Sequence, residues 1–128
     1  MSLNRKYMSS YDKNKNKIRL WFYMNKDKEI KIVYWRDIPA QILIGRGRSA
    51  KKIILSEKFE KTIDICAMKT DSKDMESYLK YWRKSNPLNY NGEAYKAAET
   101  EAKKIELFYS KDKLRSIIDN NGWNKKEV

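Results

Sequence analysis

Histidine is absent from this 128-residue chain, and cysteine occurs only once. Without histidine the chain lacks the commonest general base and metal ligand, which excludes a catalytic triad built on histidine. One cysteine cannot complete a structural zinc site or an internal disulfide. Only carboxylate chemistry or oxygen ligation of a hard cation stays open. We therefore favour a non-enzymatic role without a cofactor.

Glycine and proline are scarce, at four and two residues, which disfavours long disordered linkers. The chain has no apolar run near the ~20 residues that a membrane-spanning helix needs. Its first residues, Met1–Lys6, lack the apolar core of a signal peptide. These absences predict a cytoplasmic protein without a membrane span.

Charged residues are abundant, at 36% of the chain, and the net charge is +12. A basic balance of this size favours an acidic partner, either a protein or a nucleic acid. The hydrophobic fraction of 41%, with many aromatic residues, is enough to build one core. Composition therefore predicts one small domain with a heavily charged surface.

The first 23 residues differ from the rest, with six basic residues against one acidic residue. They show no hydrophobic periodicity before a candidate strand at residues 18–23, which is typical of a flexible basic arm. We hypothesise that Met24 is the native start and that residues 1–23 are an extension. The expected organisation is then this extension followed by a single α+β domain over residues 24–128.

Three short β-branched runs, at residues 30–35, 41–44 and 53–55, predict strands. Their connections are too short for a parallel crossover, which favours antiparallel pairing. Helical spacing follows after Ser56, from residue 71 or 72 through Trp82, over 94–108, and from Ser110 to 118. The predicted fold is α+β, with a small antiparallel sheet of two to three N-terminal strands covered by three to four C-terminal helices. Cys66 lies on an apolar helical face and is expected to be buried.

The string Tyr34–Gln41 combines large aromatics with an adjacent Arg36–Asp37 pair at a strand end. Two interpretations stay open. In one, Trp35 offers a flat apolar face and Arg36 a fork of donors to an acidic partner. In the other, Trp35 belongs to the core, Arg36 pairs locally and Asp37 caps its own turn.

The loop Gly45–Lys52 carries four basic residues and no acidic one. Its glycines free the backbone, and its cations could hold a phosphate or a carboxylate. The loop does not match the Walker-type phosphate loop. The alternative is an ordinary solvated hairpin loop, since exposed loops commonly carry glycine and charge.

From Tyr34–Gln41 onward the chain resembles the small bacterial "virulence factor" domain family. The likeness continues through the basic loop, Leu55–Phe59 and Tyr78–Arg83, and it ends near Gly122–Trp123. Family members resemble standalone proteins or domains attached to helical-repeat and iron–sulfur-scaffold-like modules. The resemblance implies an accessory or adaptor role and supplies no catalytic residues.

We therefore expect an adaptor that binds an acidic protein partner through a basic hairpin face. The alternative is a nucleic-acid-binding module that uses the same loop. The candidate binding residues are Trp35, Arg36, Asp37, Gln41, Arg46, Arg48, Lys51 and Lys52.

Overall fold

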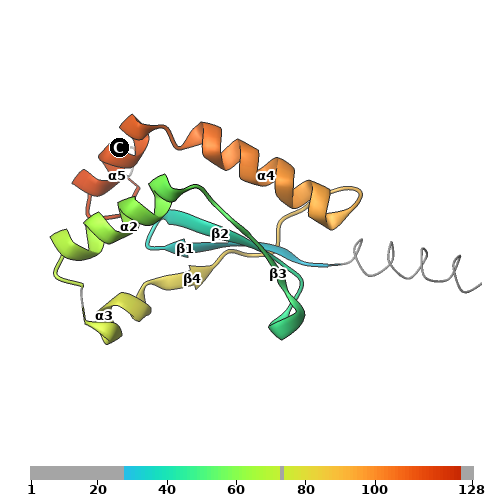
Figure 1. Ribbon diagram of the computed structural model, residues 1–128, viewed down its shortest axis with the longest axis horizontal. Helices are drawn as coiled ribbons and strands as arrows, with labels where there is room; N and C mark the ends of the chain where they lie inside the picture. The colour runs from blue at the N-terminus through green and yellow to red at the C-terminus, as the bar shows by residue number, and fades with distance from the viewer. Residues whose placement is uncertain (1–27, 73, 125–128) are drawn as a thin grey trace, which may run out of the picture.

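A computed structural model describes residues 28–72 and 74–124 (Figure 1). The elements in chain order are β1 (Ile30–Trp35), β2 (Ile38–Ile44), the 3-10 turn η1 (Gly47–Ser49), β3 (Lys51–Ile54), α2 (Glu57–Lys69), α3 (Met75–Lys80), β4 (Trp82–Lys84), α4 (Ala94–Phe108) and α5 (Lys111–Asp119). The predicted α+β class is confirmed. Residues 1–27, including the expected strand at 18–23 and the proposed start at Met24, lie outside the described part.

The sheet has four antiparallel strands in the order β3-β2-β1-β4, which corrects the predicted two to three. The added strand is β4, in a stretch that we expected to be helical through Trp82. Helix α3 ends at Lys80 because β4 pairs with the free edge of β1, where Trp82 stands opposite Trp35. Of the residues with helical spacing there, Met75 and Leu79 are exposed, whereas Tyr78 and Trp82 pack partly buried against the core.

One face of the sheet is covered by α4. The register pairs Ile30 with Ile44 and Ile32 with Ile42, so these four side chains share a face, and all are buried. Helix α4 packs against β2 and β3, and its buried Ala98 has a side chain small enough for close approach to the sheet.

The remaining helices gather at one end of the sheet, where α2 packs against β2 and α5 (Figure 1). Cys66 lies on the buried side of α2 and is fully buried, as expected. Burial raises the pKa of its thiol, which keeps it in the neutral form. Among the described residues, no helix covers the other end of the sheet face opposite α4 (Figure 1).

Candidate functional site

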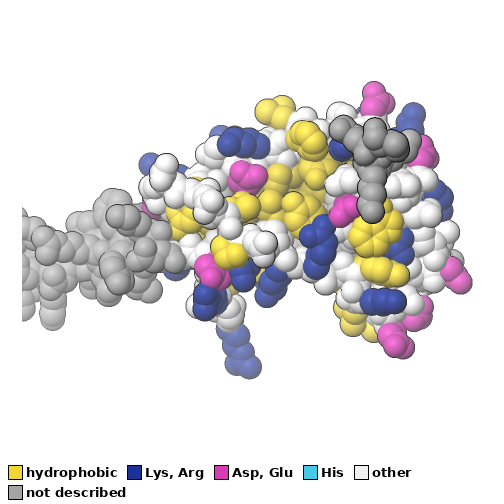
Figure 2. Space-filling model, turned by 180° about the vertical axis from the view of Figure 1, so that it is seen from behind, with side chains coloured by type: hydrophobic (Ala, Val, Ile, Leu, Met, Phe, Trp, Pro, Cys, Tyr) yellow, Lys and Arg dark blue, Asp and Glu magenta, His cyan; other side chains and the backbone are white. Residues whose placement is uncertain are grey.

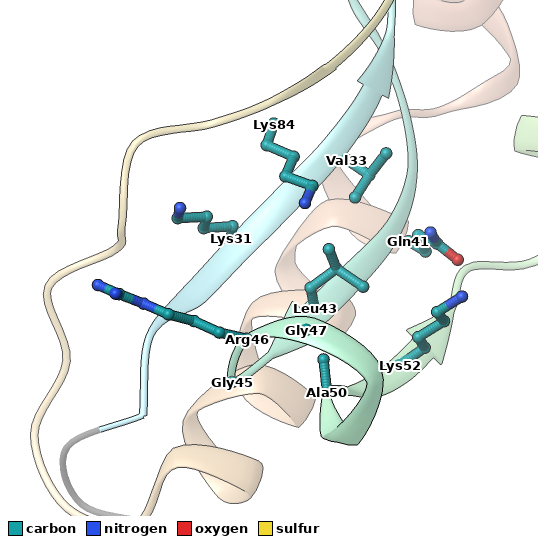
Figure 3. Close-up of a pocket in the computed structure, with 10 residues that line it drawn as sticks. All are labelled: Lys31, Val33, Gln41, Leu43, Gly45, Arg46, Gly47, Ala50, Lys52 and Lys84. Carbon is teal, nitrogen blue, oxygen red and sulfur yellow. The ribbon is translucent and has the colours of Figure 1, made fainter.

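The open part of the sheet forms a groove of about 730 Å³ with basic walls and an apolar floor. Val33 stands opposite Gln41 and Lys84, and Leu43 stands opposite Lys31 and Lys52, so these side chains project from one face. Figure 3 shows Lys31 and Lys84 on one side of Val33 and Leu43, Lys52 on the other, and α4 behind the sheet. We call this surface the basic groove; its lining residues are Lys31, Val33, Gln41, Leu43, Gly45, Arg46, Gly47, Ala50, Lys52 and Lys84.

A turn that contains two glycines forms one end of the basic groove. Gly45 and Gly47 have φ of +92° and +66°, a region that favours glycine over residues with a Cβ. The Gly45 N–H donates to the Glu29 carbonyl at 2.8 Å, which ties the loop to the start of β1. This turn holds Arg46 at the rim of the groove.

The cations of the basic groove differ in how they are paired. Glu29 forms ion pairs with Arg46 and, at 3.4 Å, with Lys31. The hydrogen bond from Arg46 is the main reason why the pKa of Glu29 is lowered. Among the described residues, Lys52 and Lys84 form no ion pair. These two ammonium groups are therefore the strongest candidates for holding an incoming anion.

Positive charge does not cover the whole surface evenly. In Figure 2, Lys and Arg side chains are scattered among hydrophobic and acidic ones and do not merge into one continuous area. The chain's large net charge therefore does not form a uniform basic surface on the side that Figure 2 shows.

The structure divides the eight predicted binding residues into three groups. Gln41, Arg46 and Lys52 line the basic groove. Arg48 and Lys51 are exposed but are not part of its lining. Trp35, Arg36 and Asp37 form a separate cluster at the far end of the β1–β2 hairpin.

Two of the groove's basic residues, Lys31 and Lys84, were missed by sequence reasoning, as were Val33 and Leu43 of its floor. Lys31 alternates with the buried Ile30 and Ile32, so the strand period alone could have placed it on the open face. Lys84 could not be found in this way, because its stretch was expected to be helical. The register of β4 against Val33 brings it to the groove.

Trp35 is completely buried and belongs to the core, as the second interpretation of its string had it. Its indole N–H donates to the Tyr78 carbonyl at 2.8 Å, and its ring contacts those of Tyr78 and Tyr81. The indole therefore presents no face to a partner. Its role here is to join the hairpin to α3 and the segment that follows α3.

Arg36 is 6% exposed and lies among aromatic rings. Its guanidinium carbon lies 4.2 Å from the Tyr81 ring centroid and 4.9 Å from that of Trp35. The guanidinium donates to the Asn121 carbonyl and, at 3.3 Å, to the Ser72 hydroxyl. The second interpretation expected Arg36 to pair locally, whereas its hydrogen-bond partners Ser72 and Asn121 lie 36 and 85 residues away in the sequence.

Asp37 joins three parts of the chain. One carboxylate oxygen accepts from Arg83 of β4 at 2.8 Å, and the other accepts from the Asn124 N–H at 2.8 Å. The Asp37 N–H donates to the Gly122 carbonyl at 2.9 Å. Both oxygens are therefore used in structural contacts, which leaves Asp37 poorly placed to act as a general base.

Within residues 28–72 and 74–124, no group of three acidic, cysteine or histidine side chains is arranged to hold a metal ion. The described helices are also too short or too polar to cross a membrane. The arrangement most clearly suited to a ligand is the basic groove, which can hold several carboxylate or phosphate oxygens at once.

Comparison with known proteins identifies the family of this chain. A sequence model of the family described as "Virulence factor" matches residues 33–118, which is well over half of the chain. The chain therefore belongs to the virulence factor family, and the match begins within β1 and ends within α5. No curated protein and no solved structure matches this chain.

Proposed function

We propose that this chain is an accessory domain that binds an acidic segment of a protein partner in the basic groove. The observation that carries the proposal is the pair Lys52 and Lys84, which have no ion-pair partner among the described residues and flank an apolar floor. Carboxylates complement these ammonium groups, and complementary charge steers association and fixes register.

Charge pairing alone is too weak to hold a partner. An exposed ion pair contributes about 0.2–1 kcal/mol, whereas micromolar affinity requires about 8 kcal/mol. The partner must therefore also cover Leu43 on the floor, since Val33 is already buried. A suitable partner is an extended segment in which acidic and apolar side chains alternate at every second position, so that both kinds face the groove.

Nucleic acid is the second candidate, supported by the net charge of +12. Sheets that bind single strands combine cations with aromatic rings on which bases stack. The lining of the basic groove contains no aromatic residue. This difference favours a protein partner over a single-stranded nucleic acid.

The test is capture of partners from a lysate of the source organism, with and without nuclease treatment. The variant Lys52→Glu/Lys84→Glu reverses both unpaired cations. Its control, Lys103→Glu/Lys104→Glu, makes the same charge change at exposed positions on α4. We expect a defined protein that survives nuclease, is lost with the groove variant and is kept with the control.

Two outcomes would reject the proposal. Capture that is equal for the two variants would exclude the basic groove as the binding surface. Capture of nucleic acid alone, with a steep loss of binding as salt rises, would establish the second candidate in place of the first.

A further inference from the structure

A second hollow, of about 360 Å³, adjoins the basic groove at Gln41, which lines both. It lies where α2 and α3 meet strands β2, β3 and β4. Leu55 and Ile63 contribute aliphatic walls, and Tyr78 and Trp82 contribute aromatic ones. We call it the aromatic hollow; its chemistry differs from that of the basic groove.

The two aromatic side chains form a fixed corner of the aromatic hollow. The rings of Tyr78 and Trp82 meet edge to face, with centroids 5.8 Å apart and an interplanar angle of 79°. Both residues are half-buried, and Tyr78 also contacts the buried ring of Trp35. Aromatic rings held in this way attract cations to their faces.

Two carboxylates complete the lining. Glu60 and Asp64 lie one turn apart on α2, and both are exposed. Neither forms an ion pair with another described residue, whereas the neighbouring Glu57 pairs with Lys61 at 3.5 Å. Burial raises the pKa of the Tyr78 hydroxyl, and the charges of Asp64 and then Glu60 raise it further. Both carboxylates thus line the same hollow as the aromatic corner.

We infer that the aromatic hollow binds the alkylammonium group of a lysine side chain from a protein partner. The aliphatic walls suit the four-carbon stem, the rings attract the ammonium, and the two unpaired carboxylates neutralise its charge. An exposed acidic pair on a helix is ordinarily only a solvated face. Here it lines a hollow with aromatic walls, and this combination recognises a cation on an aliphatic stem.

The choice of a protein lysine over a free polyamine rests on the proposed function. The nearby Lys52 and Lys84 repel a free polycation, whereas a partner that brings carboxylates to the basic groove neutralises them. The assignment of an amine site does not depend on that choice. The amine site and the choice of a protein lysine can therefore be rejected separately.

The experiment follows the Trp82 indole N–H by nuclear magnetic resonance during titration of the full chain with two tripeptides. One is acetyl-Gly-Lys-Gly-amide, and the other replaces lysine with norleucine, which has the same stem without the ammonium. We expect saturable shifts with the lysine peptide only. Equal responses to both peptides would show an apolar hollow without cation selectivity and would overturn the inference.

Variants locate the site. Glu60→Gln/Asp64→Asn keeps side-chain size and should weaken binding of the lysine peptide about fivefold or more. The control Glu99→Gln/Asp119→Asn removes the same charge at exposed positions on α4 and α5 and should leave the affinity unchanged. Undiminished binding by the first variant would refute the site.

Two further experiments distinguish a lysine side chain of a protein from a free polyamine. The groove variant Lys52→Glu/Lys84→Glu should retain binding of the lysine peptide, so failure of the basic groove does not remove the amine site. Spermidine replaces the peptide in the second arm. Binding of spermidine without binding of the lysine peptide would overturn the assignment to a lysine side chain.

Discussion

Replacing Arg36 with methionine would remove a buried guanidinium that lies near three aromatic rings. Its central carbon is 4.2, 4.9 and 5.6 Å from the ring centroids of Tyr81, Trp35 and Trp123. A desolvated cation–π contact contributes about 2 kcal/mol, and a charge-assisted hydrogen bond such as that to the Asn121 carbonyl about 1.5 kcal/mol. Both contributions are lost in the variant.

An opposing effect reduces the loss. The buried Nε of Arg36 has no hydrogen-bond partner among the described residues, and removing it relieves a cost of about 1–2 kcal/mol. Methionine is similar in volume, so the cavity left is small. The net expectation is that Arg36→Met lowers the free energy of unfolding by about 2 kcal/mol, or the melting temperature by about 8 °C.

The assay is urea unfolding followed by tryptophan fluorescence, read as a shift in midpoint at unchanged slope. Arg36→Lys should lose at least as much stability, because an ammonium is more strongly hydrated and lacks the planar fork. Stability of Arg36→Met equal to or above that of the native chain would refute the reasoning, since relief from burying the charge would then outweigh the aromatic contacts.

Three further predictions concern single positions. Gly122→Ala should lower the free energy of unfolding, measured by thermal unfolding, by about 2 kcal/mol, because Gly122 has a φ of +93° and a Cβ there would lie 2.9 Å from Arg36 Cδ. A decrease below about 0.5 kcal/mol would contradict this prediction. Burial, with a smaller effect of neighbouring charge, raises the pKa of the Tyr109 hydroxyl to about 12. The neutral phenol therefore stabilises the fold below pH 10, and this contribution to the free energy of unfolding is lost as the pH rises toward 12. Tyr109→Phe should therefore reduce the loss of stability between pH 10 and 12, and an unchanged alkaline profile would exclude Tyr109 as its cause. Ser85→Ala leaves the Ile32 N–H without the hydroxyl that accepts from it at 2.9 Å, so Ile32 should exchange its amide hydrogen faster while the amides of α4 do not.

Local patterns were enough to predict most of the fold. The β-branched runs became β1, β2 and β3, and alanine-rich helical spacing became α4. The helix expected from Ser110 became α5, and Ser110 caps it by accepting from the Lys113 N–H at 3.2 Å. These features depend on neighbours close in sequence, which is why periodicity and capping residues reveal them.

Features that depend on distant contacts were not predictable in this way. Strand β4 forms because β1 has a free edge, and no pattern within three residues signals this. Arg36 has a positive φ of 53°, a conformation that favours glycine, and its partner Asn121 lies 85 residues away. The string Tyr34–Gln41 correctly predicted a turn, but it could not show whether Trp35 binds a partner or belongs to the core.

The central claim is that an acidic protein segment binds in the basic groove. Its most direct test is a nuclear magnetic resonance titration of the full chain with a synthetic peptide in which glutamate and valine alternate at every second position. The account predicts that the largest saturable amide shifts fall on Val33, Leu43 and Lys52, and that Lys52→Glu/Lys84→Glu abolishes them while Lys103→Glu/Lys104→Glu does not. Shifts confined to α4 or α5, or equal responses from the two variants, would contradict the claim.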